Sequence, residues 1–143
     1  MSESLLMAVA DDVTLGLNQG TYSLAVTALR LYQPKFELKE MDSLHVSVVP
    51  RSILEKRVSR KLVAFDCGID IGVQQRVGTD AAQLDSLSAL VTELSDRLRT
   101  LILPSYPGAR LVELSNDPVY APDHLSQLQQ FTSVIRATFR VWK

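Results

Sequence analysis

The sequence predicts an α+β fold, in which a mixed, mainly antiparallel sheet is flanked by two main helices and a short third helix. Two apolar spacings lead to this prediction. Apolar residues recur every three or four positions over residues 2–17 and 84–101, the period of a helix buried on one side. They alternate with polar residues over residues 63–77 and 131–141, the period of a strand. Helices packed on one face of an antiparallel sheet satisfy both patterns.

The first element is expected to be a helix over Ser2–Leu17. Apolar residues recur at every fourth position from Leu5 to Val13, and Gly20 suits a C-terminal cap. The next segment, Tyr22–Tyr32, is rich in leucine, valine and threonine and is therefore predicted to be a strand.

Strict alternation predicts two further strands. Leu44–Val49 alternates until Pro50, which is expected to end that strand because proline has no N–H for the ladder. The second strand, Val63–Val77, is longer. Its apolar positions are Val63, Phe65, Cys67, Ile69, Ile71, Val73 and Val77, and its polar positions include Asp66, Asp70 and Gln74. We expect one face on the core, the other in solvent, and a strand that extends beyond the core.

The most regular helix is predicted to begin at Thr79 or Asp80, with Gln83 placed for a capping box, and to end before Pro104. Its apolar stripe consists of Leu84, Leu87, Val91, Leu94, Leu98 and Leu101.

The last third of the sequence predicts four short elements. They are a strand near Arg110–Leu114, a turn at Asn116-Asp-Pro, a short helix from Asp123 and a final strand over Phe131–Val141. We expect residues 1–143 to form a single domain.

Composition excludes several functional classes. The chain has 143 residues, 46% hydrophobic and 22% charged, with a formal net charge of -1. That balance argues against a dedicated nucleic-acid binder, which usually carries a marked positive excess. The start has no basic residues of a signal peptide, and no apolar run is long enough to cross a membrane, so a cytoplasmic protein is expected.

The sequence offers no catalytic, metal-binding or cofactor-binding constellation. Cys67 is the only cysteine and falls on the apolar parity of its strand, so we interpret it as a small buried hydrophobe. His45 and His124 are the only histidines, and neither has a recognisable partner that would orient it as a general base. No glycine-rich phosphate loop is present.

Two charged groups remain as candidate contact surfaces. Asp66, Asp70 and Gln74 share one strand face. At the usual rise per residue Asp66 and Asp70 lie about 13 Å apart, so their carboxylates do not form a proton-sharing pair. A solvated face, an interface or the wall of a channel all fit them. The basic cluster consists of Arg51, Lys56, Arg57, Arg60 and Lys61, expected in a loop between two strands. A solvated loop, a phosphate contact or a contact with a neighbouring subunit all fit this cluster.

Several segments together resemble the tail terminator (tail completion) proteins of long-tailed bacteriophages. They are Leu44–Arg51 (LHVSVVPR), Ser59-Arg60, Asp70–Val77 (DIGVQQRV), the helix Leu84–Leu98 and Phe131–Val141 (FTSVIRATFRV). In this order they span about two thirds of the chain.

The resemblance implies a non-enzymatic virion protein of the tail or neck, assembled in the host cytoplasm. It implies a mixed sheet flanked by helices and a hexameric ring that caps the tail tube, ends tube polymerisation and joins tail to head. Its partners would be further copies of itself, the tail tube protein and a head–tail connector or neck protein. DNA would pass through the ring without sequence-specific binding.

Other readings of the sequence stay open. The chain fits another head–tail connector component, such as a neck or stopper protein. It also fits a small non-phage adaptor that adds a strand to its partner, or a small enzyme or ligand-binding domain whose site is scattered over loops.

Overall fold

The computed structural model describes residues 4–32, 43–77, 81–116 and 130–143. Along the chain these form helix α1 (Leu5–Asn18), strands β1 (Ala28–Arg30), β2 (His45–Arg57) and β3 (Val63–Arg76), helix α2 (Ala81–Thr100), and strands β4 (Arg110–Asn116) and β5 (Gln130–Trp142). The strands form one sheet in the order β1-β2-β3-β5-β4. β1 runs parallel to β2, and the other neighbouring pairs are antiparallel. The predicted mixed, mainly antiparallel α+β fold is confirmed.

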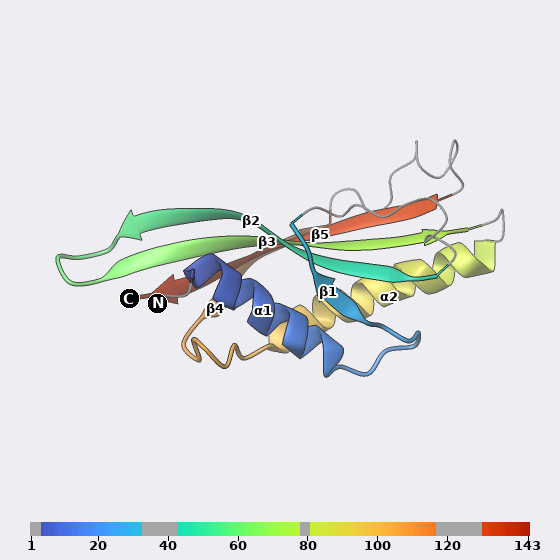
Figure 1. Cartoon of the computed structure of the whole chain (residues 1–143), viewed down its shortest axis with the longest axis horizontal. Coiled ribbons are helices and arrows are strands. Elements are labelled where there is room, and N and C mark those ends of the chain that lie inside the picture. The colour runs from blue at the N-terminus through green and yellow to red at the C-terminus, as the bar shows by residue number, and fades with distance from the viewer. Residues whose placement is uncertain (1–3, 33–42, 78–80, 117–129) are drawn as a thin grey trace.

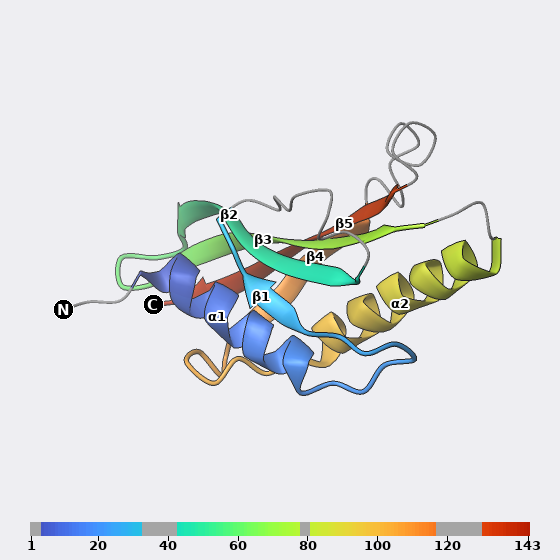
Figure 2. The ribbon, with the colours of Figure 1, turned by 45° about the vertical axis from the view of Figure 1, so that its right-hand side comes forward.

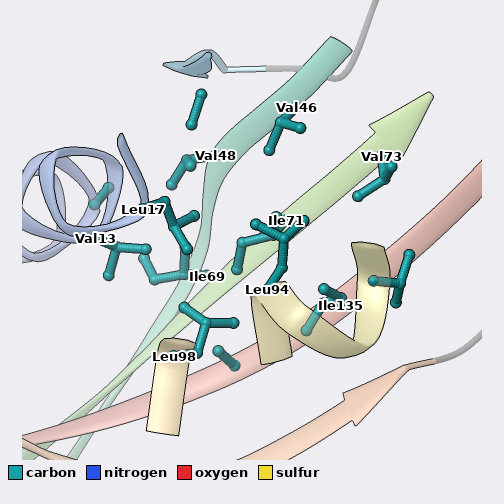
Figure 3. Packing of buried hydrophobic residues seen from close by; sticks show 14 of the residues in the cluster. Val13, Leu17, Val46, Val48, Ile69, Ile71, Val73, Leu94, Leu98 and Ile135 are labelled. Carbon is teal, nitrogen blue, oxygen red and sulfur yellow. The ribbon is translucent and has the colours of Figure 1, made fainter. Parts of the chain in front are cut away.

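Both helices cover the same face of the sheet (Figures 1 and 2). Val13 and Leu17 of α1 and Leu94 and Leu98 of α2 point at the sheet, where they meet the apolar side chains of β2, β3 and β5 (Figure 3). The predicted leucine stripe of α2 is confirmed by the burial of Leu87, Val91, Leu94 and Leu98. Of the helices in the described ranges, neither has the length and apolar character to cross a membrane.

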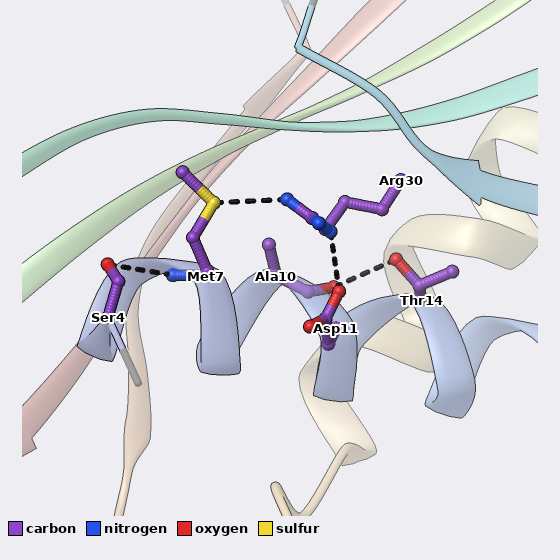
Figure 4. Close-up of polar contacts among 6 residues, drawn as sticks. All are labelled: Ser4, Met7, Ala10, Asp11, Thr14 and Arg30. Atoms are coloured by element: carbon purple, nitrogen blue, oxygen red, sulfur yellow. Dashed lines mark hydrogen bonds and ion pairs between the residues drawn. The ribbon is translucent and has the colours of Figure 1, made fainter. Parts of the chain in front are cut away.

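Helix α1 begins at Leu5 because Ser4 caps it: the Ser4 hydroxyl oxygen accepts a hydrogen bond from the Met7 N–H at 3.5 Å. Arg30 ties β1 to this helix (Figure 4). Its Nε lies 2.6 Å from the Asp11 carboxylate, and its Nη1 lies 3.0 Å from the Met7 sulfur. One ion pair therefore joins the edge of the sheet to the helix layer.

The prediction that Gly20 caps α1 is wrong. Gln19 takes the cap position in a right-handed conformation, and its N–H donates to the Leu15 carbonyl at 3.1 Å, while the Gly20 N–H donates to the Leu17 carbonyl at 3.2 Å. The glycine instead leaves room for Tyr22, whose hydroxyl oxygen lies 2.5 Å from where a Cβ would be and donates to the Leu17 carbonyl at 2.7 Å.

The predicted strand Tyr22–Tyr32 is wrong over most of its length, since β1 comprises only Ala28–Arg30. Helix side chains bind backbone groups of this segment, one before β1 and one at the first residue of β1. The Ser23 N–H donates to the Glu93 carboxylate at 3.1 Å. The Asn18 side chain accepts from the Ala28 N–H at 2.7 Å and donates to its carbonyl at 3.0 Å.

Pro50 does not end β2, contrary to the prediction, and the strand continues to Arg57. The ladder with β3 shifts register between Pro50 and Ser52, which marks a bulge where a proline can be accommodated. On the other side of β2, the parallel ladder with β1 reaches only from Val46 to Val48. Pro50 therefore lies beyond the segment that β1 pairs.

The central strands are much longer than the helix beside them. β3 has 14 residues and spans roughly 46 Å, whereas α1, also with 14 residues, spans roughly 21 Å. One end of the β2–β3 hairpin therefore extends past α1, as Figure 1 shows at the left. The expectation that the strand Val63–Val77 itself leaves the core is not confirmed: every residue of β3 except Arg76 is buried or partly buried, and the exposed outer part belongs to β2.

The two remaining strand predictions are confirmed. β4 contains the predicted Arg110–Leu114 and continues to Asn116, and β5 contains Phe131–Val141. Several predictions lie outside the described residues: the cap of α2 at Thr79 or Asp80, the turn after Asn116, the short third helix from Asp123, and His124.

Replacing Leu94 by alanine should lower the free energy of unfolding by about 2–5 kcal/mol, because Leu94 is fully buried between α2 and the sheet. The matched control is Ile102→Ala at an exposed position, which should change stability by less than about 0.5 kcal/mol. Urea unfolding followed by circular dichroism measures both variants. Equal stability of the two variants would contradict the packing of α2.

Candidate assembly interface

The outer half of β2 and the turn after it project from the molecule, and we call residues 51–62 the arm. Every residue of the arm is exposed. Four of them are large and apolar, with exposed fractions between 36% and 58%: Ile53, Leu54, Val58 and Leu62. Apolar side chains gathered in this way on a surface commonly mark a contact site.

The arm contains all five basic residues that were predicted as interface candidates. Arg51, Lys56 and Arg57 lie within β2, whereas Arg60 and Lys61 lie in the turn that follows. The prediction of a loop is therefore wrong for the first three, because β2 continues through Pro50. These residues are held in a paired strand, which fixes the direction in which the arm presents its charges.

The five basic side chains divide into two groups. Arg51 lies 2.8 Å from the Asp70 carboxylate, and Lys56 lies 3.7 Å from that of Asp66. Arg57, Arg60 and Lys61 form no ion pair with any residue that the structure describes. The guanidinium of Arg57 donates to the Arg60 carbonyl at 3.5 Å. The tip of the arm therefore carries cations that are available to a partner.

Asp66, Asp70 and Gln74 share the sheet face opposite the helices, as predicted, but the expected solvated acidic face is wrong. Asp66 and Gln74 are buried, and Asp70 is partly covered. The guanidinium of Arg140 donates to both carboxylate oxygens of Asp66, at 2.7 and 3.0 Å. These hydrogen bonds hold the pKa of Asp66 below its ordinary value of 3.8. Cations from β2 and β5 thus neutralise the acidic positions of β3.

Gly68 makes the Arg51–Asp70 pair possible. A Cβ at this position would lie 2.6 Å from the Ser52 hydroxyl oxygen and 2.7 Å from an Arg51 guanidinium nitrogen. The missing side chain leaves the path along which Arg51 crosses β3. The close approach at Gly68 is thus made by side chains of β2, those of Arg51 and Ser52.

Sequence reasoning missed Arg140 as a partner of Asp66. The two residues stand directly opposite each other on β3 and β5, although 74 positions separate them in the sequence. The alternating pattern put Arg140 among the polar positions of its strand. The pair with Asp66 could be found only from the register between β3 and β5.

The other candidate groups give no reactive site. Cys67 is buried, and that burial raises the pKa of its thiol to about 11, in agreement with its interpretation as a small hydrophobe. His45 lies at the start of β2 with its Nε2 3.5 Å from the Ser43 hydroxyl oxygen. Within the described ranges, no group of three or more His, Cys, Asp or Glu side chains is placed to hold a metal ion.

The fold is similar to that of a chain in a solved structure titled "Virion of native gene transfer agent (GTA) particle". The TM-score is 0.67, and the match covers 99% of this chain and 100% of that chain, with 16% sequence identity. At this identity the similarity establishes the shared fold. No protein-family model matches the sequence, and no curated protein matches it either.

The Asp66–Arg140 pair should appear in the pH dependence of stability. A carboxylate with a lowered pKa in the folded state stabilises the fold fully above its unfolded-state pKa, and this stabilisation is lost as the pH falls through the folded-state pKa. Asp66→Asn should therefore be less stable than the wild type at pH 7, and the difference should shrink below pH 4. Urea unfolding from pH 7 to pH 2 measures it. A difference independent of pH would contradict the ion pair.

Proposed function

We propose that the chain is a structural virion protein that forms a hexameric ring at the head-proximal end of a phage tail tube. The ring ends polymerisation of the tube, joins the tail to the head or neck, and leaves a channel for DNA. The chain acts through its shape and its contacts, without turnover. Its partners are further copies of itself, the tail tube protein and a head–tail connector or neck protein.

One observation carries this proposal most directly: the fold matches a chain of a gene transfer agent virion over essentially the whole length of both chains. The segments that resemble tail terminators supply the second support. They fall on β2, β3, α2 and β5, which are the elements that build the core and the arm. A likeness confined to one helix or hairpin would carry much less weight.

The arm supports a role in assembly. A paired hairpin that projects past α1, with apolar side chains and with cations at its tip that pair with no residue the structure describes, is suited to contact another chain. The outer edges of the sheet are less suited to strand addition. β2 carries Pro50 and a bulge, and β4 has a register shift between Leu111 and Glu113. Bulges and prolines at edges disfavour pairing with a further strand.

We propose that the sheet face to which Asp66, Asp70 and Gln74 belong lines the channel, with the cations that cover Asp66 and Asp70 at its surface. A strongly cationic wall would bind phosphates and hinder the passage of DNA. On this face the two carboxylates pair with Arg51, Lys56 and Arg140, so these five side chains keep a net charge of only +1, which supports a lumen that is not strongly cationic.

The double variant Arg57→Glu/Arg60→Glu should lose ring assembly and binding to tail tubes while the monomer keeps its fold, because both side chains are exposed and form no ion pair within the described part of the chain. The matched control Arg57→Lys/Arg60→Lys keeps the charge and should still assemble. Size-exclusion chromatography with light scattering, alone and with tail tube protein, measures assembly.

Rings of unchanged mass that still bind tubes in the glutamate variant would contradict the role of the arm. Binding of the wild type to head–tail connector rings but not to tail tubes would assign the chain to a neck or stopper role.

A further inference from the structure

A hollow lies where the C-terminal ends of the two helices meet, and we call it the helix-end hollow. It has a volume of about 240 Å³ and is lined by Asp12, Leu15, Gly16, Gln19, Arg97, Thr100, Leu101, Ile102 and Pro104. The Arg97 Nε donates to the Gly16 carbonyl at 3.0 Å, which joins the end of α2 to α1. The hollow therefore has a fixed position in the helix layer.

Exposed apolar side chains border the hollow. Leu15 is 49% exposed, and Ile102, at 74%, is among the most exposed large apolar residues of the described chain. Neither is needed for the core, which closes beneath them with Leu17 and Leu98 fully buried. The hollow thus presents apolar surface to a partner.

The charged side chains around the hollow balance, but the backbone of the helix ends favours cations. The carbonyl ends of both helices converge on the hollow, and each helix C-terminus carries partial negative charge. Asp12 lines it, and its two carboxylate oxygens accept hydrogen bonds from Ser105 at 2.9 and 3.2 Å. Asp96 lies on the adjoining surface, where Arg99 pairs with it. Arg97 is the opposing cation, and the Gly16 carbonyl accepts its hydrogen bond.

The arm has the complementary character. It carries five basic residues and one acidic residue, Glu55, and so a net charge of +4. Since the whole chain has a net charge of -1, the remainder carries -5. Two copies therefore attract each other when the arm of one meets the body of the other, and repel when arm meets arm.

We propose that the arm of one copy docks into the helix-end hollow of the next. Val58 and Leu62 at the tip would contact Leu15 and Ile102, while Arg57, Arg60 and Lys61 would face the helix ends and their acidic residues. Within one chain the arm points away from the place where the two helices end (Figures 1 and 2), so it does not fill its own hollow.

Such a contact joins two different surfaces of the same protein. Contacts of this head-to-tail kind generate rings when the rotation between copies closes. The inference rests on the proposed function and deepens it by naming the surface that receives the arm. Duplex DNA fits the arm less well as a partner. The cations of the arm are interspersed with exposed aliphatic side chains, which make no favourable contact with phosphates.

Cysteine cross-linking tests the contact. Val58→Cys and Ile102→Cys are prepared as separate proteins, mixed, and treated with a short bis-maleimide. Cys67 does not interfere because it is buried and its thiol has a pKa of about 11. The matched control replaces Ile102→Cys with Leu29→Cys, a leucine of 49% exposure on β1.

A covalent dimer is expected from the first mixture and not from the control. A double Val58→Cys/Ile102→Cys variant should give a ladder of cross-linked products up to the size of the ring.

The other outcomes separate the two proposals. If rings form but the mixture links no better than the control, or Val58→Cys links to itself, the docking site is wrong and the ring stands. If no rings form under any condition, both proposals fail. A third outcome would overturn docking and make the arm a phosphate contact. In that outcome the wild type binds duplex DNA through the arm, Arg57→Glu/Arg60→Glu abolishes the binding, and no Val58–Ile102 link appears.

Discussion

The length of the central hairpin is the constraint on which the structure depends. Strands advance more than twice as far per residue as helices, so a helix equal in residue number to β3 covers less than half of its length. The hairpin gains backbone pairing along its whole length, but only its inner part gains a packed helix layer. Residues 51–62 are left exposed, and they carry the apolar and cationic side chains of the arm.

The ion pairs on the opposite sheet face link this extended hairpin to the neighbouring strand. Arg140 from β5 and Lys56 from β2 both reach Asp66 of β3, and Arg51 crosses Gly68 to reach Asp70. Because the pairs link three neighbouring strands, they oppose bending of the hairpin relative to the sheet. A stiff arm with a free tip loses little conformational freedom on docking, which favours assembly by fixed geometry.

Sequence periodicity predicted the elements whose environment is uniform along their length. The alternation in Val63–Val77 and Phe131–Val141 and the leucine stripe of α2 each predicted a buried apolar face, and all three faces were confirmed. The polar face of β3 is buried as well, which alternation alone did not predict. Errors arose where distant groups decided the local structure. Side chains of α1 and α2 bind the backbone of the segment predicted as the strand Tyr22–Tyr32, and a bulge lets β2 pass Pro50. For the candidate site, the charged residues were found from composition, but their pairing and the helix-end hollow depend on register and tertiary packing.

Electron microscopy of the purified wild-type chain, alone and mixed with tail tube protein, tests the central claim most directly. The account predicts rings of six copies with an open centre, in which neighbouring subunits are related by rotation about one axis, and it predicts one such ring at a single end of each tube. Particles no larger than a monomer in both samples, or a two-fold dimer in which the arms face each other, would contradict it.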